Sequence, residues 1–393
     1  MKKQTQAIHL EYERRDAYDS LSVPVYNTLA YEFDNAAVMA EAFTDKIKAP
    51  DYSRVENPTV TNLERRVAAL TDAAHATAFN SGMAAISNTL MALAAQGKNI
   101  VTSKHLFGNT YALLVATLRR FGVKVRLRDL TNIEAVREAI DDDTCCVFLE
   151  ILTNPQLEVA DLKAISEVAH KKNVPLVVDS TVIPFTQFSA KSLGVDIEVV
   201  SSSKYVSGGA TSLGGLVIDY GTPYNGDFAK RLYGEMLFNF GAYMTPQVAY
   251  MQTIGLETLD ARYRVQSSNA LELAKKLRSL PQIKYVNYVG LEDNPYHELA
   301  QRQFGKTAGA MICIDLESKE ACFSFLNNLK LIHRATNLFD NRSLAIHPAS
   351  TIFGAFSESM RKSMDVKDTT IRLSVGLEDV DDLFEDIKQA VNS

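Results

Sequence analysis

Between residues 74 and 220 the chain alternates short apolar runs with amphipathic segments, and this alternation constrains the fold more than any other feature of the sequence. The apolar runs lie at residues 74–80, 99–103, 123–127, 144–150 and 175–180. Strand-then-helix repetition is typical of a mostly parallel, doubly wound sheet. Ligands bind at the carboxyl ends of the strands in such sheets, so the residues that end the apolar runs are the candidates for a site.

The stretch from Asp196 to Gly215, DIEVVSSSKYVSGGATSLGG, places Lys204 at the end of one further apolar run. A lysine there loses hydration and needs either a partner or a chemical role. One interpretation is a solvated lysine in a Ser/Gly turn. The other is a lysine that forms a Schiff base with pyridoxal phosphate (PLP), while Ser201 and Ser203 hold the phosphate. That cofactor also requires an acidic partner for its ring nitrogen.

The other strand ends supply candidates for these parts. Ser81-Gly82-Met83 opens a helix whose backbone N–H groups would receive a phosphate, although Ser81 taken alone indicates only a helix N-cap. Asn154 follows the apolar run at 144–150, and Asp179 ends the run at 175–180. An acidic residue in the position of Asp179 is more often structural, but it is also what a pyridinium nitrogen requires.

Upstream of the alternating region, Tyr52 and Arg54 lie in a polar loop. Tyrosine and arginine are good phosphate ligands, although in most loops such a pair is merely solvated. Thr61 and Glu64 form a T-x-x-E pattern, which predicts that a helix starts at Thr61.

The composition changes near residue 245, where helical and strand patterns alternate in an order that indicates a smaller α/β domain with an antiparallel sheet. Arg372 lies in an apolar strand of this part, where either a substrate carboxylate or an internal acidic residue must pair with it. We therefore expect an N-terminal arm at 1–50, a cofactor-binding domain at 51–245 and a C-terminal domain at 246–393. The arm either packs on a neighbouring subunit or forms an ordinary domain edge.

Charge and composition exclude several functions. The formal net charge is -6 and no basic tract occurs, which argues against a partner that is a nucleic acid or an anionic membrane. The four cysteines form no CxxC pair and no metal-ligand pattern, so they indicate core residues in a reducing compartment and no metal. No run of 18 apolar residues and no apolar leader occurs, so we expect a cytoplasmic protein with small-molecule partners.

Several motifs together resemble the Cys/Met-metabolism PLP-dependent enzymes. They are YSRxxNPT, NSGMAA, the strand end at Asp179, SSSKY and IRLSVGLE, and the resemblance runs from about residue 20 to the C-terminus. It implies an α/β protein of the PLP-dependent transferase type (aspartate-aminotransferase-like, fold type I), with a large, mostly parallel sheet domain and a smaller C-terminal α/β domain. It also implies PLP as the cofactor and a homotetramer built from catalytic dimers.

The same resemblance implies a role for individual residues. Lys204 is the Schiff-base lysine and Asp179 the partner of the pyridine nitrogen. Asn154 matches the residue near the 3'-oxygen of the cofactor, and Arg372 matches the residue that binds the α-carboxylate of the substrate. The phosphate-binding positions are matched by Gly82 and Met83 through their backbone, by Ser201 and Ser203, and by Tyr52 and Arg54 from the neighbouring subunit.

Three segments resemble the O-acetylhomoserine sulfhydrylase branch most: GATSLGG, GAYMTPQVAYMQTIGLETLDAR and NLFDNRSLAIHPAST. Asn337, in the third, stands where the lyases typically have serine, on the substrate side. The chain also departs from the family pattern. Phe107 replaces the usual tyrosine, which keeps the stacking on the cofactor ring and loses the hydroxyl. Gly209 replaces a histidine, and Val182 replaces a phenylalanine.

The implied reaction is γ-replacement on O-acetyl-L-homoserine with sulfide or a thiol, giving homocysteine or methionine. Two alternatives stay open from the residues: a cystathionine γ-synthase or a methionine or cystathionine γ-lyase, and a catalytically impaired PLP-fold protein. The sequence leaves the nucleophile, the acyl group and the homoserine or serine carrier undetermined.

Overall fold

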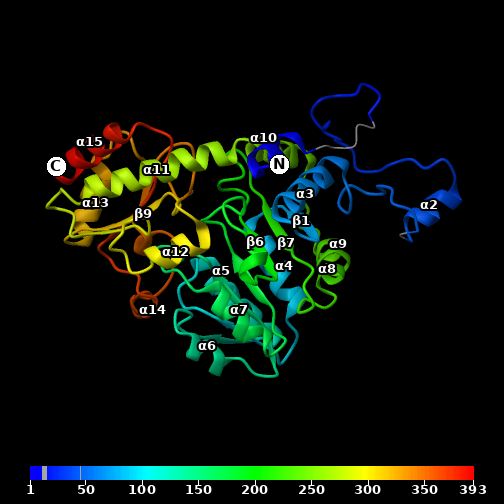
Figure 1. Cartoon of the computed structure of the whole chain (residues 1–393), viewed down its shortest axis with the longest axis horizontal. Coiled ribbons are helices and arrows are strands. Elements are labelled where there is room, and N and C mark those ends of the chain that lie inside the picture. The colour runs from blue at the N-terminus through cyan, green and yellow to red at the C-terminus, as the bar shows by residue number, and fades with distance from the viewer. Residues whose placement is uncertain (11–15, 45) are drawn as a thin grey trace.

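The centre of the protein is a seven-stranded sheet, described by a computed structural model that covers residues 1–10, 16–44 and 46–393 (Figure 1). The strand order is β1-β7-β6-β5-β4-β2-β3. Their bounds are β1 (His75–Phe79), β2 (Asn99–Thr102), β3 (Lys124–Leu127), β4 (Thr144–Glu150), β5 (Leu176–Asp179), β6 (Ile197–Val200) and β7 (Gly215–Asp219).

This sheet is parallel except for β7, which pairs antiparallel with both β1 and β6. The inner strands are buried on both faces, and this explains why β4, β5 and β6 read as continuous apolar runs instead of alternating ones. The predicted α/β class, with a large and mostly parallel sheet, is confirmed. The parallel strands β4, β5 and β6 are neighbours, so their carboxyl ends meet at one edge.

Helices cover the two faces of this sheet: α3 (Pro58–Thr71), α4 (Gly82–Leu93), α5 (Gly108–Ala112), α6 (Ile133–Ala139), α7 (Leu162–His170), α8 (Phe228–Arg231), α9 (Phe238–Phe240) and α10 (Pro246–Glu257). The predicted start of α3 is wrong. The helix begins at Pro58, and the side chain of Asn57 accepts the N–H of Thr59 as its cap. Glu64 forms no capping box because its carboxylate accepts the backbone N–H of Ala78 instead.

A second sheet of five strands has the order β10-β11-β12-β9-β8. Its strands are β8 (Tyr285–Asn287), β9 (Met311–Asp315), β10 (His333–Arg334), β11 (Leu344–Ile346) and β12 (Thr370–Ser374), and they pair antiparallel except for β10 with β11. Helices α11 (Leu259–Leu277), α12 (His297–Phe304), α13 (Lys319–Asn328), α14 (Glu358–Ser363) and α15 (Val380–Val391) accompany it. The central strand β12 places Arg372 inside the protein.

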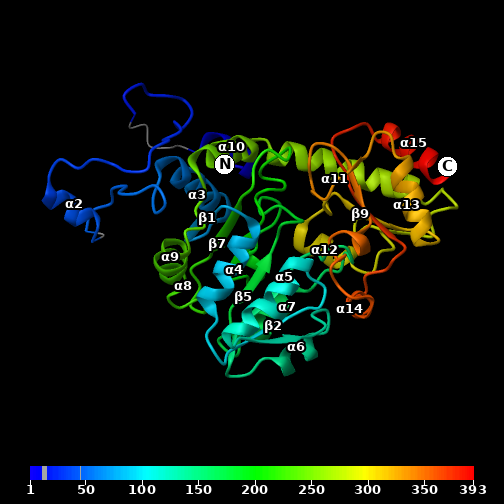
Figure 2. The same ribbon diagram turned by 180° about the vertical axis from the view of Figure 1, so that it is seen from behind.

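The N-terminal segment contains α1 (Lys3–His9), which contacts α3 and α10, and α2 (Ala36–Ala42). In both views α2 lies far from the two sheets, at the end of an extended segment (Figures 1 and 2). The boundaries at residues 50 and 245 remain proposals. Helix α10 packs on α3 while the following helix α11 packs on α15, so this pair connects the two sheets.

Within the described part of the chain, no helix is long and apolar enough to cross a membrane. The same residues contain no cluster of three or more His, Cys, Asp or Glu side chains suited to a metal ion. Cys146, Cys313 and Cys322 are buried, Cys145 is half-buried, and none of the four forms a disulfide.

Candidate active site

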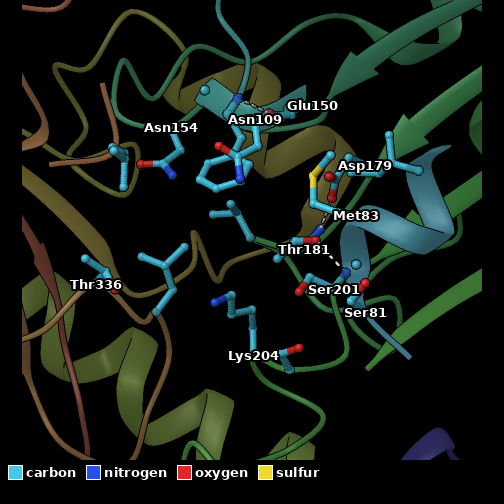
Figure 3. Close-up of a pocket in the computed structure, with 18 of the residues that line it drawn as sticks. Ser81, Met83, Asn109, Glu150, Asn154, Asp179, Thr181, Ser201, Lys204 and Thr336 are labelled. Carbon is cyan, nitrogen blue, oxygen red and sulfur yellow. Dashed lines mark hydrogen bonds between the residues drawn. The ribbon is translucent and has the colours of Figure 1, made fainter. Parts of the chain in front are cut away.

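A cavity of about 690 Å³ lies where the carboxyl ends of β4, β5 and β6 face the loops of the smaller sheet. Lys204 points into this space, with Asp179, Thr181 and Ser201 on one wall and Asn154 on the opposite wall (Figure 3). Nine of the residues singled out from the sequence line the cavity: Gly82, Met83, Phe107, Asn154, Asp179, Ser201, Ser203, Lys204 and Arg372. The strand ends therefore converge, as expected for a parallel sheet.

Lys204 lies in the turn that follows β6, and its environment disfavours the ammonium form. Burial, with a smaller contribution from the positive charge of Arg372, lowers the pKa of Lys204 to about 8. Its Nζ donates a hydrogen bond of 2.8 Å to Oδ1 of Asn337. Lys204 is thus half-buried and bonded to an amide, with no acidic partner among the described residues, and its amine becomes available as a base near neutral pH.

Asp179 ends β5 and turns its carboxylate toward the same cavity. Oδ1 accepts the backbone N–H of Thr181 at 2.9 Å, and Oγ1 of Thr181 accepts the backbone N–H of Ser201 at 2.8 Å. Burial raises the pKa of Asp179 above its ordinary value. A half-buried carboxylate that faces the cavity and contacts no cation of the described chain suits a cationic ligand group such as a protonated ring nitrogen.

Gly82 and Ser201 form a close contact at the first turn of α4. A Cβ atom added to Gly82 would lie 2.6 Å from Cβ and 2.7 Å from Oγ of Ser201, so only glycine fits there. The side chain of Ser81 caps the helix by accepting the N–H of Ala84. The N–H groups at the start of this 12-residue helix, with the hydroxyl of Ser201, make a cradle suited to a phosphate.

Ser203 has a different local role from Ser201. Its hydroxyl donates to the carbonyl oxygen of Gly214 at 3.1 Å and accepts the N–H of Gly214 at 2.9 Å. These two bonds close the loop between β6 and β7 beside Lys204. Ser203 lines the cavity, but in this arrangement its hydroxyl is occupied by the backbone.

Arg372 is 2% exposed and forms no ion pair with any acidic residue of the described chain. Its guanidinium donates to Oδ1 of Asn154 at 3.2 Å and to the carbonyl oxygens of Thr336 and Asn337 at 3.3 Å, while Nε has no partner. The internal acidic partner that the sequence left open is therefore absent from this part of the structure. A buried arginine held only by neutral acceptors is suited to a carboxylate ligand.

The cavity wall beyond Lys204 is apolar. Phe107, at the start of α5, lines it together with Leu213, Leu338, Ile352, Ala355 and Phe356. Among the described residues that line the cavity there is no tyrosine, so none supplies the phenolic hydroxyl that Phe107 lacks. The cations of the lining are Lys204 and Arg372.

Gly209, the second departure from the family pattern, has a backbone φ of +141°, which side chains rarely adopt. A Cβ atom at this position would approach Nδ2 of Asn341 to 3.2 Å. Asn341 instead donates to the carbonyl oxygen of Gly208. Any histidine here would require a different loop. Val182, the third departure, lines the cavity two residues before Pro184.

Sequence reasoning missed several polar residues that line the cavity, among them Glu150 and Thr181. Glu150 ends β4 as Asp179 ends β5, and the two residues are paired in the register of the sheet. An acidic residue at the end of an apolar strand was the signal used for Asp179, and the same signal would have found Glu150.

Tyr52 and Arg54 do not reach this cavity from within the same chain. They line a separate cavity of about 1180 Å³ between the N-terminal segment and the α3 and α9 region. The guanidinium of Arg54 lies 5.4 Å from the centroid of the Tyr52 ring and donates to the carbonyl oxygen of Phe238. Any contact of this pair with a phosphate held at Gly82 would have to come from a second chain.

Comparison with known proteins shows that the chain is similar to PLP-dependent enzymes over nearly its whole length. The family described as "Cys/Met metabolism PLP-dependent enzyme" matches residues 4–392. An L-methionine gamma-lyase of Fusobacterium nucleatum subsp. polymorphum is 38% identical over 98% of this chain and 97% of its own length. An O-acetyl-L-homoserine sulfhydrylase of Corynebacterium glutamicum is 32% identical over 98% of this chain and 95% of its own length.

A solved structure from Campylobacter jejuni, assigned provisionally as an O-acetylhomoserine (thiol)-lyase, is 35% identical and covers 100% of both chains with a TM-score of 0.95. That structure contains N'-pyridoxyl-lysine-5'-monophosphate, in which the cofactor is joined to a lysine. The cavity described above supplies a lysine, the half-buried carboxylate of Asp179 and a phosphate cradle, so its residues fit the same group.

Proposed function

Because the chain belongs to the Cys/Met metabolism PLP-dependent enzymes and PLP is its cofactor, we propose that it catalyses γ-replacement on O-acetyl-L-homoserine, with sulfide or a small thiol as the nucleophile. The products are homocysteine or methionine, with acetate released. The observation that carries the proposal is the composition of the cavity: one buried arginine suited to a single carboxylate, and an apolar wall in which Phe107 offers no hydroxyl.

We propose that Lys204 would hold the aldehyde of PLP and Asp179 its ring nitrogen, and that the N-terminus of α4 with Ser201 would receive its phosphate. Bound PLP supplies an aldehyde for the substrate amine and a ring that takes up electrons released at Cα. Arg372 binds the α-carboxylate, since its guanidinium is buried and lacks an acidic partner. Asn154 holds one side of that guanidinium in place.

Lys204 is the proton carrier in this proposal. With a pKa of about 8, a fraction of its amine is neutral near pH 7 and can remove the Cα proton. Asn337 accepts a hydrogen bond from Nζ and so directs the amine. Transfer of a further proton from Cβ expels the group on Cγ as its electron pair departs, and the nucleophile then adds to Cγ.

Phe107 favours an ester substrate over a thioether. Acetate is the anion of a carboxylic acid, whose side-chain analogues have a pKa near 4, and it departs without a proton. A thiolate is far more basic, with a pKa of about 8.5 for cysteine, and its departure gains more from an acid. Phe107 offers no hydroxyl to act as that acid, and no tyrosine of the same chain's described residues lines the cavity.

The nucleophile is proposed to be small and uncharged apart from its sulfur. Cysteine would bring a second ammonium and a second carboxylate into the cavity, where Lys204 and Arg372 already serve the first substrate. The apolar wall formed by Leu213, Ile352 and Phe356 offers these charges no partner. Sulfide and methanethiol add no such charges.

The test uses purified holoenzyme and three assays: O-acetylhomoserine with sulfide, O-acetylhomoserine with cysteine, and methionine alone. Homocysteine formation should be the fastest. Faster cystathionine formation would overturn the proposal in favour of a cystathionine γ-synthase. Faster 2-oxobutanoate release from methionine would favour a methionine γ-lyase, the alternative supported by the 38% identical relative. Protein that takes up no PLP would indicate an impaired PLP-fold protein.

We also propose that the active site is completed by a second copy of the chain within a homotetramer, with Tyr52 and Arg54 reaching its phosphate. The support is their position in a separate cavity, beside the extended segment that carries α2. Mixing inactive Lys204→Ala and Arg54→Ala variants should restore activity, because a hybrid dimer contains one site with both residues intact. No restored activity in verified hybrids would contradict this arrangement.

A further inference from the structure

Glu150 is a buried acid in the active-site cavity to which the proposed chemistry gives no role. It is the last residue of β4, it is 6% exposed, and it lines the cavity near Asn109 (Figure 3). Its neighbour in the sheet register is Asp179. Paired residues on adjacent parallel strands direct their side chains to the same face of the sheet, and their backbones lie about 4.8 Å apart. The carboxyl groups of Glu150 and Asp179 are therefore neighbours at the cavity edge of the sheet.

The carboxyl of Glu150 is hydrogen-bonded to the backbone of two separate loops. Oε1 accepts the N–H of Phe107 at 2.5 Å, and the N–H of Asn154 also bonds to the carboxyl. Phe107 begins the helix α5 and presents its ring to the cavity, while Asn154 holds the guanidinium of Arg372. One side chain therefore connects the residue expected on the cofactor ring with the residue that supports the substrate carboxylate site.

The charge state of Glu150 follows from its surroundings. Burial, and next the negative charge of Asp179, raise the pKa of Glu150 well above its ordinary range. Two neighbouring carboxylates in a site with little water disfavour each other's ionisation, so a proton on Glu150 removes the repulsion from Asp179. The cations of the cavity, Lys204 and Arg372, form no ion pair with Glu150 in the described chain. Of the two carboxyl groups, Asp179 is the one that is ionised, because its proposed partner is the protonated ring nitrogen.

We propose that Glu150 is a positioning residue that acts as a neutral carboxylic acid, holding the Phe107 and Asn154 loops in place and leaving Asp179 as the charged member of the pair. The proposal rests on the roles given above to Asp179 and Arg372. It does not depend on which nucleophile the enzyme uses, since it concerns the cofactor site.

The experiment compares Glu150→Gln, Glu150→Asp and Glu150→Ala in the PLP-loaded enzyme, with Glu198→Gln as the matched control. Glu198 is a buried carboxyl on the same sheet that bonds to Ser180 and Tyr220 and does not line the cavity. The readouts are the dissociation constant of PLP, the pH midpoint of the visible absorbance of the bound cofactor, and the separate values of kcat and KM.

Glutamine keeps the accepting oxygen and the size of a neutral acid, so Glu150→Gln should leave the PLP dissociation constant within about threefold and the absorbance midpoint within about 0.3 pH units of wild type. Alanine and aspartate withdraw the acceptor from two buried N–H groups, so PLP binding should weaken about tenfold or more. KM for the amino-acid substrate should rise in the same two variants, because Asn154 no longer fixes Arg372.

A fall of the absorbance midpoint by about one unit or more in Glu150→Gln would overturn the proposal, because it would show that a negative charge at Glu150 had stabilised the protonated cofactor. Wild-type behaviour of Glu150→Ala would overturn the positioning role. If Glu150→Ala fails to fold, the glutamine variant still decides the charge state and the aspartate variant the positioning. Neither the dissociation constant of PLP nor the pH midpoint of the absorbance depends on sulfhydrylase activity. A wrong role for Glu150 can therefore be distinguished from a wrong assignment of the reaction.

Discussion

Replacing Arg372 with leucine removes the guanidinium from the substrate end of the cavity while it keeps a buried apolar stem in strand β12. The arginine is 2% exposed, and its protein partners are the neutral oxygens of Asn154, Thr336 and Asn337. The fold therefore loses no ion pair. If Arg372 binds the substrate carboxylate as proposed, the substrate loses two charge-assisted hydrogen bonds, each worth roughly 1.5–3 kcal/mol.

Together these bonds amount to about 3–6 kcal/mol, which corresponds to a decrease of about 10²–10⁴ in kcat/KM at about 1.36 kcal/mol per factor of ten. Because the carboxylate is bound before and during the reaction, most of the loss should appear as a higher KM. The variant should also raise the pKa of Lys204, since the charge of Arg372 is one of the two causes that lower it. The low-pH limb of the rate profile should then move to higher pH.

Steady-state assays with O-acetylhomoserine and sulfide across pH 6–9 measure both effects. The matched control is Arg334→Leu, an exposed arginine of the same sheet whose guanidinium donates only to the carbonyl oxygen of Leu326. That variant should retain wild-type kinetics. A decrease in kcat/KM of less than about fivefold in Arg372→Leu would refute the carboxylate role, and an unchanged pH profile would refute the electrostatic link to Lys204.

Three further predictions follow from single side chains. Phe107→Tyr should change kcat/KM for O-acetylhomoserine with sulfide by less than about tenfold, because acetate departs without an acid, and a larger gain would show that the natural enzyme lacks a needed hydroxyl. In the PLP-free protein, folded Lys204 loses its proton near pH 8 and unfolded lysine near 10.5, so the unfolded state binds more protons between these values and stability should rise with pH. Urea unfolding at pH 8 and pH 10 measures this rise in the free energy of unfolding. The Lys204→Met variant should not show the rise. Phe339→Gly removes a fully buried ring stacked on Tyr205 at 4.0 Å but relieves a positive φ of 55°, so the variant should lose about 2–4 kcal/mol of unfolding free energy, and no loss in a denaturant titration would contradict the stacking role.

Much of the candidate site could be predicted from the sequence, because its residues violate the local pattern in which they occur. A lysine, an aspartate and an arginine in or at the ends of apolar strands each carry a desolvation cost that ordinary core positions avoid. Lys204, Asp179 and Arg372 all line one cavity; the alternation of strands and helices accounts for the first two, while Arg372 comes from the second sheet. Gly82 was identified for its place at a helix start, and its contact with Ser201 explains why glycine is needed there.

Other features depended on contacts between segments far apart in the chain. The T-x-x-E pattern at Thr61 and Glu64 satisfied a local rule, yet Asn57 caps the helix and Glu64 meets Ala78 on strand β1. A capping pattern describes only four consecutive residues, whereas the partner of a buried carboxylate is set by the packing of a helix on a strand. Local sequence cannot select between the two.

The sequence by itself determined the fold class, the cofactor and the chemical character of the site. Strand periodicity, and a lysine and an acid at the ends of apolar runs, can all be recognised in the order of residues along one chain. Only the tertiary structure decided which partners these groups have. Asn337 reaches Lys204 from 133 residues away, Glu150 lies beside Asp179, and Tyr52 and Arg54 lie in a different cavity. Charge states and hydrogen bonds depend on distance in space, and the pairing of strands sets that distance.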